Sequence, residues 1–187
     1  MSTAHPCPHP GPAVQDAAPS ALSLLRMAAG GEVLAVPIDA VREILEVGRL
    51  TALPRTPTFV RGVMNLRGAV VPVIDLSARL GHGEAQVGRR SCIVVVEAAA
   101  HDGLDGDPSN ELFGTDLVVG LLVDAVYEVF DTDSTQVEPV PALGTRVRPD
   151  YLGGMTRARG EVIGLLALDR VLAQADLASA IAGHTPH

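Results

Sequence analysis

The chain has no tryptophan and no lysine, and its 187 residues include only three phenylalanines, two tyrosines and two cysteines. Without lysine there is neither a phosphate-binding P-loop, whose lysine contacts the nucleotide, nor Schiff-base chemistry. The few aromatic rings and the net charge of −8 disfavour nucleic acid, because single strands stack on aromatic rings and phosphates bind clustered cations. We therefore predict no nucleic-acid partner.

Long apolar runs and export signals are also missing. The most apolar stretch, residues 117–123, is far shorter than the ~20 residues that cross a bilayer, and residues 1–19 have neither a basic start nor an apolar run. We expect a cytoplasmic protein without membrane insertion. In that reducing compartment the two cysteines form no disulfide framework, and Cys92 is predicted to be a small buried apolar side chain.

Residues capable of catalysis or metal binding do not converge in the sequence. The six histidines lie in polar loops or near the ends, where no rigid general base is positioned, and no Gly-x-Ser-x-Gly turn is present. His5, Cys7 and His9 are separated by prolines, and the aspartates of residues 102–107 lack the spacing of a calcium loop. We predict a protein that is not an enzyme and that has no cofactor and no metal site.

What the sequence does contain is an internal repeat. Residues 35–45 (AVPIDAVREIL) recur as residues 120–130 (GLLVDAVYEVF), and residues 59–71 recur in the same order as residues 151–163. Two similar blocks in one order, twice over, indicate duplication into two related lobes. The seam between the lobes is therefore the natural place to look for a site.

Short apolar segments punctuated by glycine and proline predict an all-β fold. Hairpins are expected where glycine supplies a positive φ at the turn. They are predicted to turn at Gly30-Gly31, at Leu66-Arg67-Gly68 and at Gly160. Residues 90–97 and 117–123 are predicted to pair as buried strands, and a further strand is expected at residues 50–53, before Pro54.

Three aspartates, Asp39, Asp75 and Asp169, are predicted to cap short helical segments. The turn after Asp39 is expected to carry the apolar members of residues 41–45 inward at helical spacing, and its repeat at residues 124–130 to do the same. Asp75 would start a brief helix and Asp169 a terminal one.

The same reasoning divides the chain into regions. Residues 1–20 and 181–187 carry too few large apolar side chains to offset the entropy cost of ordering, so we expect a disordered tail and a loose C-terminus. The folded domain is predicted at residues 21–180, with residues 101–116 as a polar loop insertion. Its two intertwined lobes are expected at about residues 36–90 and at residues 21–35 together with 91–180.

The stretch from Phe59 to Leu76, FVRGVMNLRGAVVPVIDL, resembles the CheW family of bacterial chemotaxis coupling proteins, and the similarity extends over residues 22–174. The resemblance implies two SH3-like five-stranded β-barrel lobes packed on a shared hydrophobic core, with short helices. It also implies a non-catalytic adaptor, recruited to membrane-anchored receptor arrays. Such proteins couple the cytoplasmic helical tips of chemoreceptors, the methyl-accepting chemotaxis proteins, to a CheA-type histidine kinase, whose regulatory domain has a CheW-like fold.

The resemblance further implies a groove between the lobes that receives the receptor tip. An apolar floor with a few fixed charges suits a helical hairpin whose apolar side chains are framed by polar ones, and an arginine fork makes two directed hydrogen bonds. Of the matching positions, Glu43 and Arg67 are the primary candidates. The full set is Val41, Glu43, Gly62, Asn65, Arg67, Val119, Gly120 and Val126.

These assignments have alternatives. Arg67 could be a solvated turn residue, and Val41 and Val126 fit core packing as well as a groove floor. Glu43 and Glu128 are repeat equivalents, and we expect Glu128 to be only the ion-pair partner of a nearby arginine. Two other functions stay open: a CheW-like subunit of a non-flagellar chemosensory pathway, in pilus motility or surface sensing, and a small-ligand-binding regulatory domain with an apolar pocket between the lobes.

Overall fold

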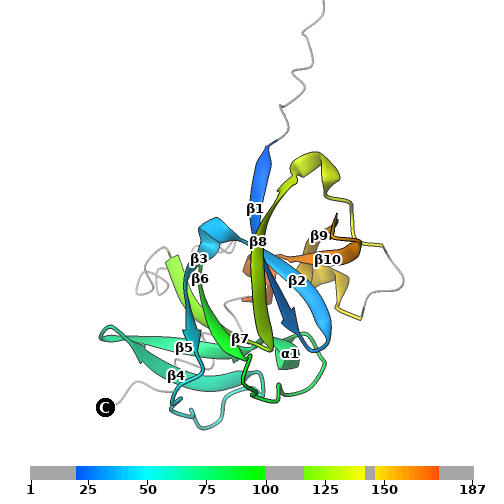
Figure 1. Cartoon of the computed structure of the whole chain (residues 1–187). Helices are drawn as coiled ribbons and strands as arrows, with labels where there is room; N and C mark the ends of the chain where they lie inside the picture. The colour runs from blue at the N-terminus through cyan, green and yellow to red at the C-terminus, as the bar shows by residue number, and fades with distance from the viewer. Residues whose placement is uncertain (1–19, 100–115, 142–145, 173–187) are drawn as a thin grey trace, which may run out of the picture.

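The structure is a computed structural model that describes residues 20–99, 116–141 and 146–172. Within these residues ten strands form two five-stranded sheets, which lie side by side in Figure 1. Apart from Ser20 and Asp116, the predicted tail, insertion and C-terminal end lie outside the described residues. No helix in the described ranges has the length and hydropathy of a membrane span.

We call the two sheets lobe 1 and lobe 2. Lobe 1 has the strand order β3-β6-β7-β5-β4, with β3 (Val41–Glu46), β4 (Val60–Leu66), β5 (Ala69–Asp75), β6 (Cys92–Ala99) and β7 (Asp116–Val123). Lobe 2 has the order β8-β1-β2-β10-β9, with β1 (Ala21–Ala29), β2 (Glu32–Pro37), β8 (Ala125–Asp133), β9 (Leu152–Ala158) and β10 (Glu161–Leu166). The predicted pairing of the two five-stranded lobes is confirmed.

The two repeats exchange strands between the lobes. The first repeat places β1 and β2 in lobe 2 and β3 to β5 in lobe 1, whereas the second places β6 and β7 in lobe 1 and β8 to β10 in lobe 2. The predicted boundary was therefore wrong, because residues 92–123 belong to lobe 1. Similarity between the repeats shows which strands are equivalent, but it does not show which sheet each one joins.

The predicted hairpins are confirmed, and all three have positive φ at both central residues, as at Gly30 and Gly31 with 59° and 82°. Arg67 and Gly68 have φ angles of 52° and 89°, and their repeat equivalents Arg159 and Gly160 have 51° and 81°. Positive φ at both central residues is the signature of a type I′ turn, whose twist matches that of the flanking strands. The latter two turns therefore each project an arginine from a rigid hairpin end.

The predicted helical segments are only partly confirmed. Residues 41–46 are strand β3, in which partly buried and exposed residues alternate, and the equivalent residues form β8. Asp75 does cap α1 (Leu76–Arg79), accepting a hydrogen bond from the Ala78 N–H at 3.1 Å. Neither Asp39 nor Asp169 caps a helix with its side chain, since both lie within the first turns of η1 (Ile38–Ala40) and α2 (Leu168–Val171).

Each lobe has its own interior, and a third apolar cluster joins the two lobes. Successive residues of a strand point to opposite faces of a sheet. In β1, Leu24 packs inside lobe 2 while Leu25 and Met27 enter the joint core; in β6, Val95 packs inside lobe 1 while Val94 enters the joint core. The predicted shared hydrophobic core is confirmed.

Each sheet is bent until its outer strands nearly meet, and a single bridge links the two edges. In lobe 1 Thr51 exchanges two backbone hydrogen bonds with Val63 of β4, at 2.8 and 2.9 Å, and in lobe 2 Glu138 does the same with Met155 of β9. The lobes are thus open sheets with barrel-like curvature, not fully hydrogen-bonded barrels. The predicted strand at residues 50–53 is reduced to the bridge at Thr51.

Candidate partner-binding surface

The structure brings together the two primary candidates, Glu43 and Arg67. Glu43 lies on β3 and Arg67 on the β4–β5 turn, at opposite edges of the lobe 1 sheet, and the bend of the sheet leaves Arg67 Nη2 3.3 Å from Glu43 Oε2. The side chain of Arg67 is 82% exposed. Most of the hydrogen-bonding groups of this guanidinium therefore face solvent and are available to a partner. An exposed ion pair of this kind contributes little to stability.

Asn65 and Gly62 have clear local roles. The Asn65 side-chain oxygen accepts a hydrogen bond from the Gly68 N–H at 2.9 Å, which braces the turn that carries Arg67. Gly62 has a φ of 140°, and a Cβ there would lie 2.3 Å from the Thr51 carbonyl oxygen. Gly62 therefore allows a close backbone approach within the chain itself, at the bridge that links the edges of lobe 1.

The apolar candidates divide between the interior and the seam. Val119 is completely buried in the shared core, and a Cβ on Gly120 would lie 2.7 Å from Ile93 Cγ2. This burial corrects their predicted placement in a groove, because neither offers surface to a partner. Val41 and Val126 are only partly buried against the shared core, so each retains some accessible surface.

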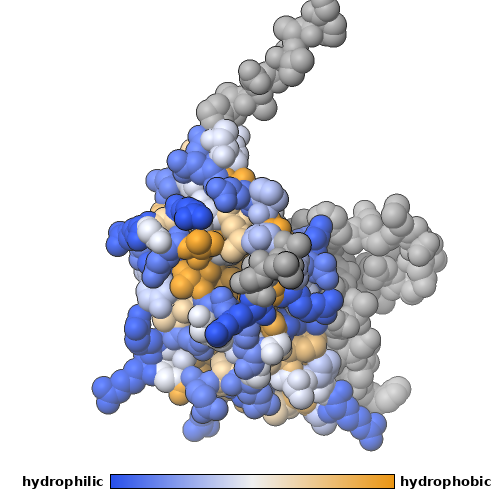
Figure 2. Space-filling view, turned by 90° about the vertical axis from the view of Figure 1, so that its right-hand side faces the viewer, coloured by the Kyte–Doolittle hydropathy of each residue, from blue (hydrophilic) through white to orange (hydrophobic). Residues whose placement is uncertain are grey.

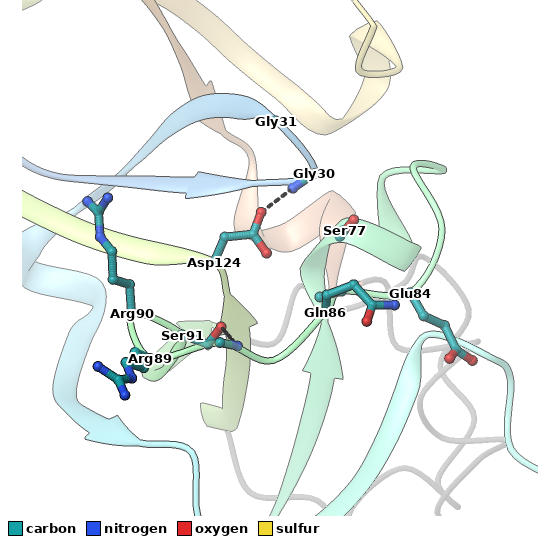
Figure 3. A pocket seen from close by; sticks show the side chains of 11 residues that line it. Gly30, Gly31, Ser77, Glu84, Gln86, Arg89, Arg90, Ser91 and Asp124 are labelled. Carbon is teal, nitrogen blue, oxygen red and sulfur yellow. Dashed lines mark hydrogen bonds between the residues drawn. The ribbon is translucent and has the colours of Figure 1, made fainter.

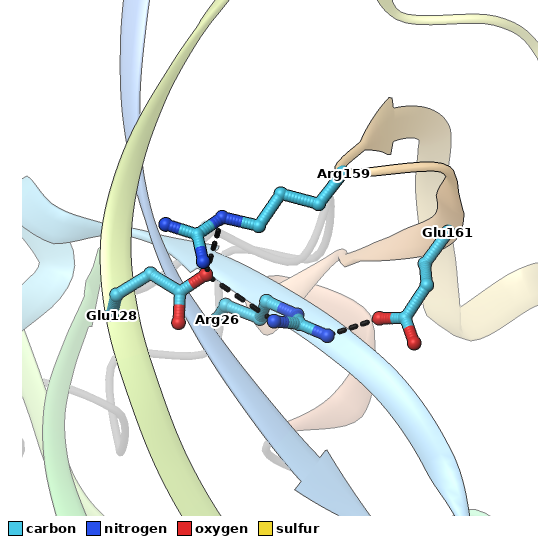
Figure 4. A network of polar contacts seen from close by, with 4 residues as sticks. All are labelled: Arg26, Glu128, Arg159 and Glu161. Carbon is cyan, nitrogen blue, oxygen red and sulfur yellow. Dashed lines mark hydrogen bonds and ion pairs between the residues drawn. The ribbon is translucent and has the colours of Figure 1, made fainter.

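Lobe 2 carries the equivalent ion pair within a larger network, which Figure 4 shows. Glu128 and Arg159, the repeat equivalents of Glu43 and Arg67, lie 3.4 Å apart. Arg26 of β1 lies 3.2 Å from Glu128 and also pairs with Glu161, and its side chain is only 15% exposed. As predicted, Glu128 is the partner of nearby arginines. The sequence does not predict that Arg26 pairs with Glu128, because the first repeat does not indicate that β1 and β8 are neighbouring strands.

Exposed apolar side chains also occupy equivalent positions in the two lobes. Ile44 on β3 corresponds to Val129 on β8, and Val70 on β5 corresponds to Val162 on β10; Tyr127 adds a ring on lobe 2. Figure 2 shows one face of the molecule, on which hydrophobic residues form a patch surrounded by hydrophilic ones. Apolar groups ringed by charged groups are characteristic of protein-binding surfaces.

The sequence does not predict the ion pair between the buried Asp75 and the partly exposed Arg61 in lobe 1. Asp75, which is completely buried, lies 3.2 Å from Arg61 Nε and accepts a further hydrogen bond from the Ala85 N–H at 2.8 Å. Arg61 in turn donates to the Ala85 carbonyl oxygen at 2.6 Å. The pair fixes the segment after α1 against β4 and β5, and only the capping role of Asp75 had a sequence signal.

A pocket of about 570 Å³ lies at the seam, as Figure 3 shows. The carboxylate of Asp124 accepts a hydrogen bond from the Gly30 N–H at 2.9 Å, with Arg89 and Arg90 at one end of the pocket and Glu84 at the other. None of the lining residues is a histidine or a cysteine. They are Gly30, Gly31, Ser77, Glu84, Ala85, Gln86, Gly88, Arg89, Arg90, Ser91 and Asp124.

Of the two cysteines, only Cys92 lies in the described part of the chain. Burial raises the pKa of the Cys92 thiol, with a backbone hydrogen bond at Val126 acting in the opposite direction, and the side chain is partly rather than fully buried. No group of three or more histidine, cysteine, aspartate or glutamate side chains able to hold a metal occurs within the described ranges. His5, Cys7, His9 and the aspartates of residues 102–107 lie outside those ranges.

Comparison with known proteins decides the family. The model of the CheW-like domain matches residues 23–176. The chain belongs to the CheW family. It is 34% identical to the chemotaxis protein CheW of Rhizobium meliloti over 79% of this chain and 85% of that protein, and 36% identical to the protein FrzA of Myxococcus xanthus over 74% and 78%.

A solved CheW structure has the same fold. The crystal structure of the scaffolding protein TtCheW from Thermoanaerobacter tengcongensis superimposes with a TM-score of 0.66, at 28% identity, over 82% of this chain and 89% of that one. The similarity covers both lobes, so the CheW-type pair of five-stranded lobes is the architecture of this chain.

Proposed function

We propose that the chain is a non-catalytic adaptor that couples the cytoplasmic helical tips of chemoreceptors to a CheA-type histidine kinase. Support comes from membership of a family of chemotaxis coupling proteins and from relatives named chemotaxis protein CheW and scaffolding protein. An adaptor needs at least two separate protein-binding surfaces, and the two lobes carry equivalent sets of exposed apolar and charged residues. Its place is in the cytoplasm, at membrane-anchored receptor arrays.

The receptor tip binds at lobe 1, next to the Glu43–Arg67 pair. The observation that carries this assignment is the exposure of Arg67 on a rigid type I′ turn, within 3.3 Å of a single surface carboxylate. Exchanging that weak pair for a carboxylate or amide of the receptor costs little and gains two directed hydrogen bonds. The accessible parts of Val41 and Val126 supply apolar surface near the seam.

The kinase regulatory domain binds the corresponding surface of lobe 2. This surface has the exposed apolar residues Tyr127, Val129 and Val162 beside the ion-pair network of Arg26 and Glu128. The two surfaces differ in their charge pattern, because the position in lobe 1 equivalent to Arg26 is the buried Val95. This difference in charge pattern supports the proposal that the two equivalent surfaces bind different partners.

Binding measurements with the two partners separately test the assignment. Arg67→Glu places a second negative charge beside that of Glu43 and should weaken binding of a receptor cytoplasmic fragment at least tenfold. The melting temperature should change little, since surface charge changes cost about 0.5 kcal/mol or less. Arg159→Glu is the matched control, because Arg159 has the same turn conformation and is 76% exposed. Equal loss of receptor binding in both variants, or loss of folding in Arg67→Glu, would contradict the proposal.

A second candidate is a CheW-like subunit of a non-flagellar chemosensory pathway. The similarity to FrzA supports this second candidate. The chain is 36% identical to FrzA and 34% identical to the chemotaxis protein CheW of Rhizobium meliloti, so it is as similar to one as to the other. The adaptor chemistry is the same in both cases, and only the receptor and kinase differ. Pull-down from the native organism, followed by identification of the kinase captured, separates the two.

A further inference from the structure

Arg79, the last residue of α1, contacts elements of both lobes. Its Nε–H donates to the Val171 carbonyl oxygen of α2 at 2.8 Å. Its guanidinium carbon lies 4.6 Å from the centre of the Phe59 ring and 5.3 Å from the centre of the Tyr151 ring. Phe59 and α1 flank strands of lobe 1, whereas Tyr151 and α2 flank strands of lobe 2. One side chain therefore spans the seam.

The groups around Arg79 are repeat equivalents of one another. The Phe59 carbonyl oxygen accepts from the Asp75 N–H at 2.7 Å, and the Tyr151 carbonyl oxygen accepts from the Ala167 N–H at 2.9 Å. Val171 occupies in α2 the position that Arg79 occupies in α1. The guanidinium thus lies where the two halves of the duplicated fold meet, and the equivalent position in the second repeat is the apolar Val171.

The contacts of Arg79 are directional, in contrast to most of the seam. The shared core consists of apolar side chains, whose contacts are individually non-directional and hold the lobes together through burial and close packing. A hydrogen bond and two ring contacts require a defined geometry. We propose that Arg79 is a positioning residue that fixes the relative orientation of the two lobes.

The functional consequence rests on the adaptor role proposed above. If the receptor binds lobe 1 and the kinase binds lobe 2, the angle between the lobes sets the geometry of the two partners. Loss of the Arg79 contacts then weakens the control that the receptor exerts on the kinase, while each partner still binds its own lobe.

Three substitutions separate this role from ordinary packing. Arg79→Lys keeps the charge but removes the planar fork, its Nε–H donor and its ring stacking. Arg79→Met is a second variant that fills similar space without charge. Arg148→Lys is the matched control, because Arg148 also lies 5.3 Å from the Tyr151 ring but pairs with Asp150 within lobe 2.

The orientation of the lobes is measured on the isolated full chain by electron–electron double resonance. Spin labels are placed at Val70→Cys on β5 and Val162→Cys on β10, which are exposed repeat equivalents, in a background with Cys7→Ser and Cys92→Ala. The chain with Arg79 should give a single narrow distance distribution, and so should Arg148→Lys. Both Arg79 variants should give a broadened or shifted distribution. An unchanged distribution in both would overturn the inference even if their melting temperatures fell.

A reconstituted assembly of receptor fragment, chain and kinase tests the consequence. Arg79→Lys should reduce the receptor's effect on kinase activity by about fivefold or more, the usual size of coupling between sites, with the two separate affinities preserved. Altered distances with unchanged coupling would refute the functional role of the fixed angle. If the unmodified chain bound neither partner, the proposed adaptor function would fail, and the distance measurement would still decide the role of Arg79.

Discussion

Gly62→Ala should strongly destabilise lobe 1, because the backbone at this position is both conformationally restricted and crowded. Gly62 has φ of 140°, and an added Cβ would lie 2.3 Å from the Thr51 carbonyl oxygen. Holding a residue with a side chain at such a φ costs about 1–3 kcal/mol. Moving Thr51 away breaks the two hydrogen bonds of the Thr51–Val63 bridge, worth about 1 kcal/mol each. The free energy of unfolding should therefore fall by about 3–5 kcal/mol.

Urea unfolding and thermal melting measure this loss. For a chain of this length it corresponds to a melting temperature lower by about 6–20 °C. Gly68→Ala is the control, because Gly68 has φ of 89° but no atom within 4 Å of an added Cβ, so only the backbone strain of about 1–3 kcal/mol applies. The reasoning is refuted if Gly62→Ala is no more destabilising than Gly68→Ala. A normally stable Gly62→Ala protein that fails to bind receptor would instead assign the glycine to partner contact.

Three further changes test other parts of the account. Asp75→Asn should lower the free energy of unfolding by about 2–4 kcal/mol, because Arg61 loses its nearer, buried counter-charge and keeps only the exposed Glu84, at 3.7 Å; urea unfolding checks this, and a loss below about 0.5 kcal/mol, as for an ordinary surface change, would contradict it. Deleting residues 1–19 should leave capture of the kinase regulatory domain intact, and a truncated chain that captures none would show the tail to be a binding site. Burial raises the pKa of the Cys92 thiol, so its alkylation by iodoacetamide at pH 8 should be slower than alkylation of the same thiol in the urea-unfolded chain. Equal rates at pH 8 would exclude that effect.

Local features of the fold could be predicted from the sequence because their causes are local. The turns at Gly30-Gly31 and Gly68 depend on residues that tolerate positive φ, and the cap at Asp75 depends on a side chain three residues from its donor. Residues 41–46 were misread because apolar side chains at positions 41, 44 and 45 match helical spacing. Pairing with β6 in the lobe 1 sheet decided the outcome.

The exchange of strands and the contacts across the seam could not be predicted in the same way. Duplication indicated two lobes, but the parallel pairing of β2 with β10 and of β5 with β7, which joins the repeats, has no local signal. The same holds for Arg26 with Glu128, 102 residues apart, and for Arg79 with Val171, 92 residues apart. Among the candidate site residues, Glu43 and Arg67 lie together on the surface, whereas Val119 and Gly120 are buried in the interior.

Co-sedimentation of the kinase with receptor assemblies tests the central claim most directly. A receptor cytoplasmic fragment assembled on vesicles is mixed with the kinase, with and without this chain, and the pelleted kinase is quantified. The account predicts that the chain increases the amount of kinase in the pellet and that Arg67→Glu abolishes this increase. The Arg159→Glu variant should still sediment with the receptor itself. A chain that binds receptor and kinase only in mutual competition, so that adding it never increases the pelleted kinase, would contradict the adaptor role.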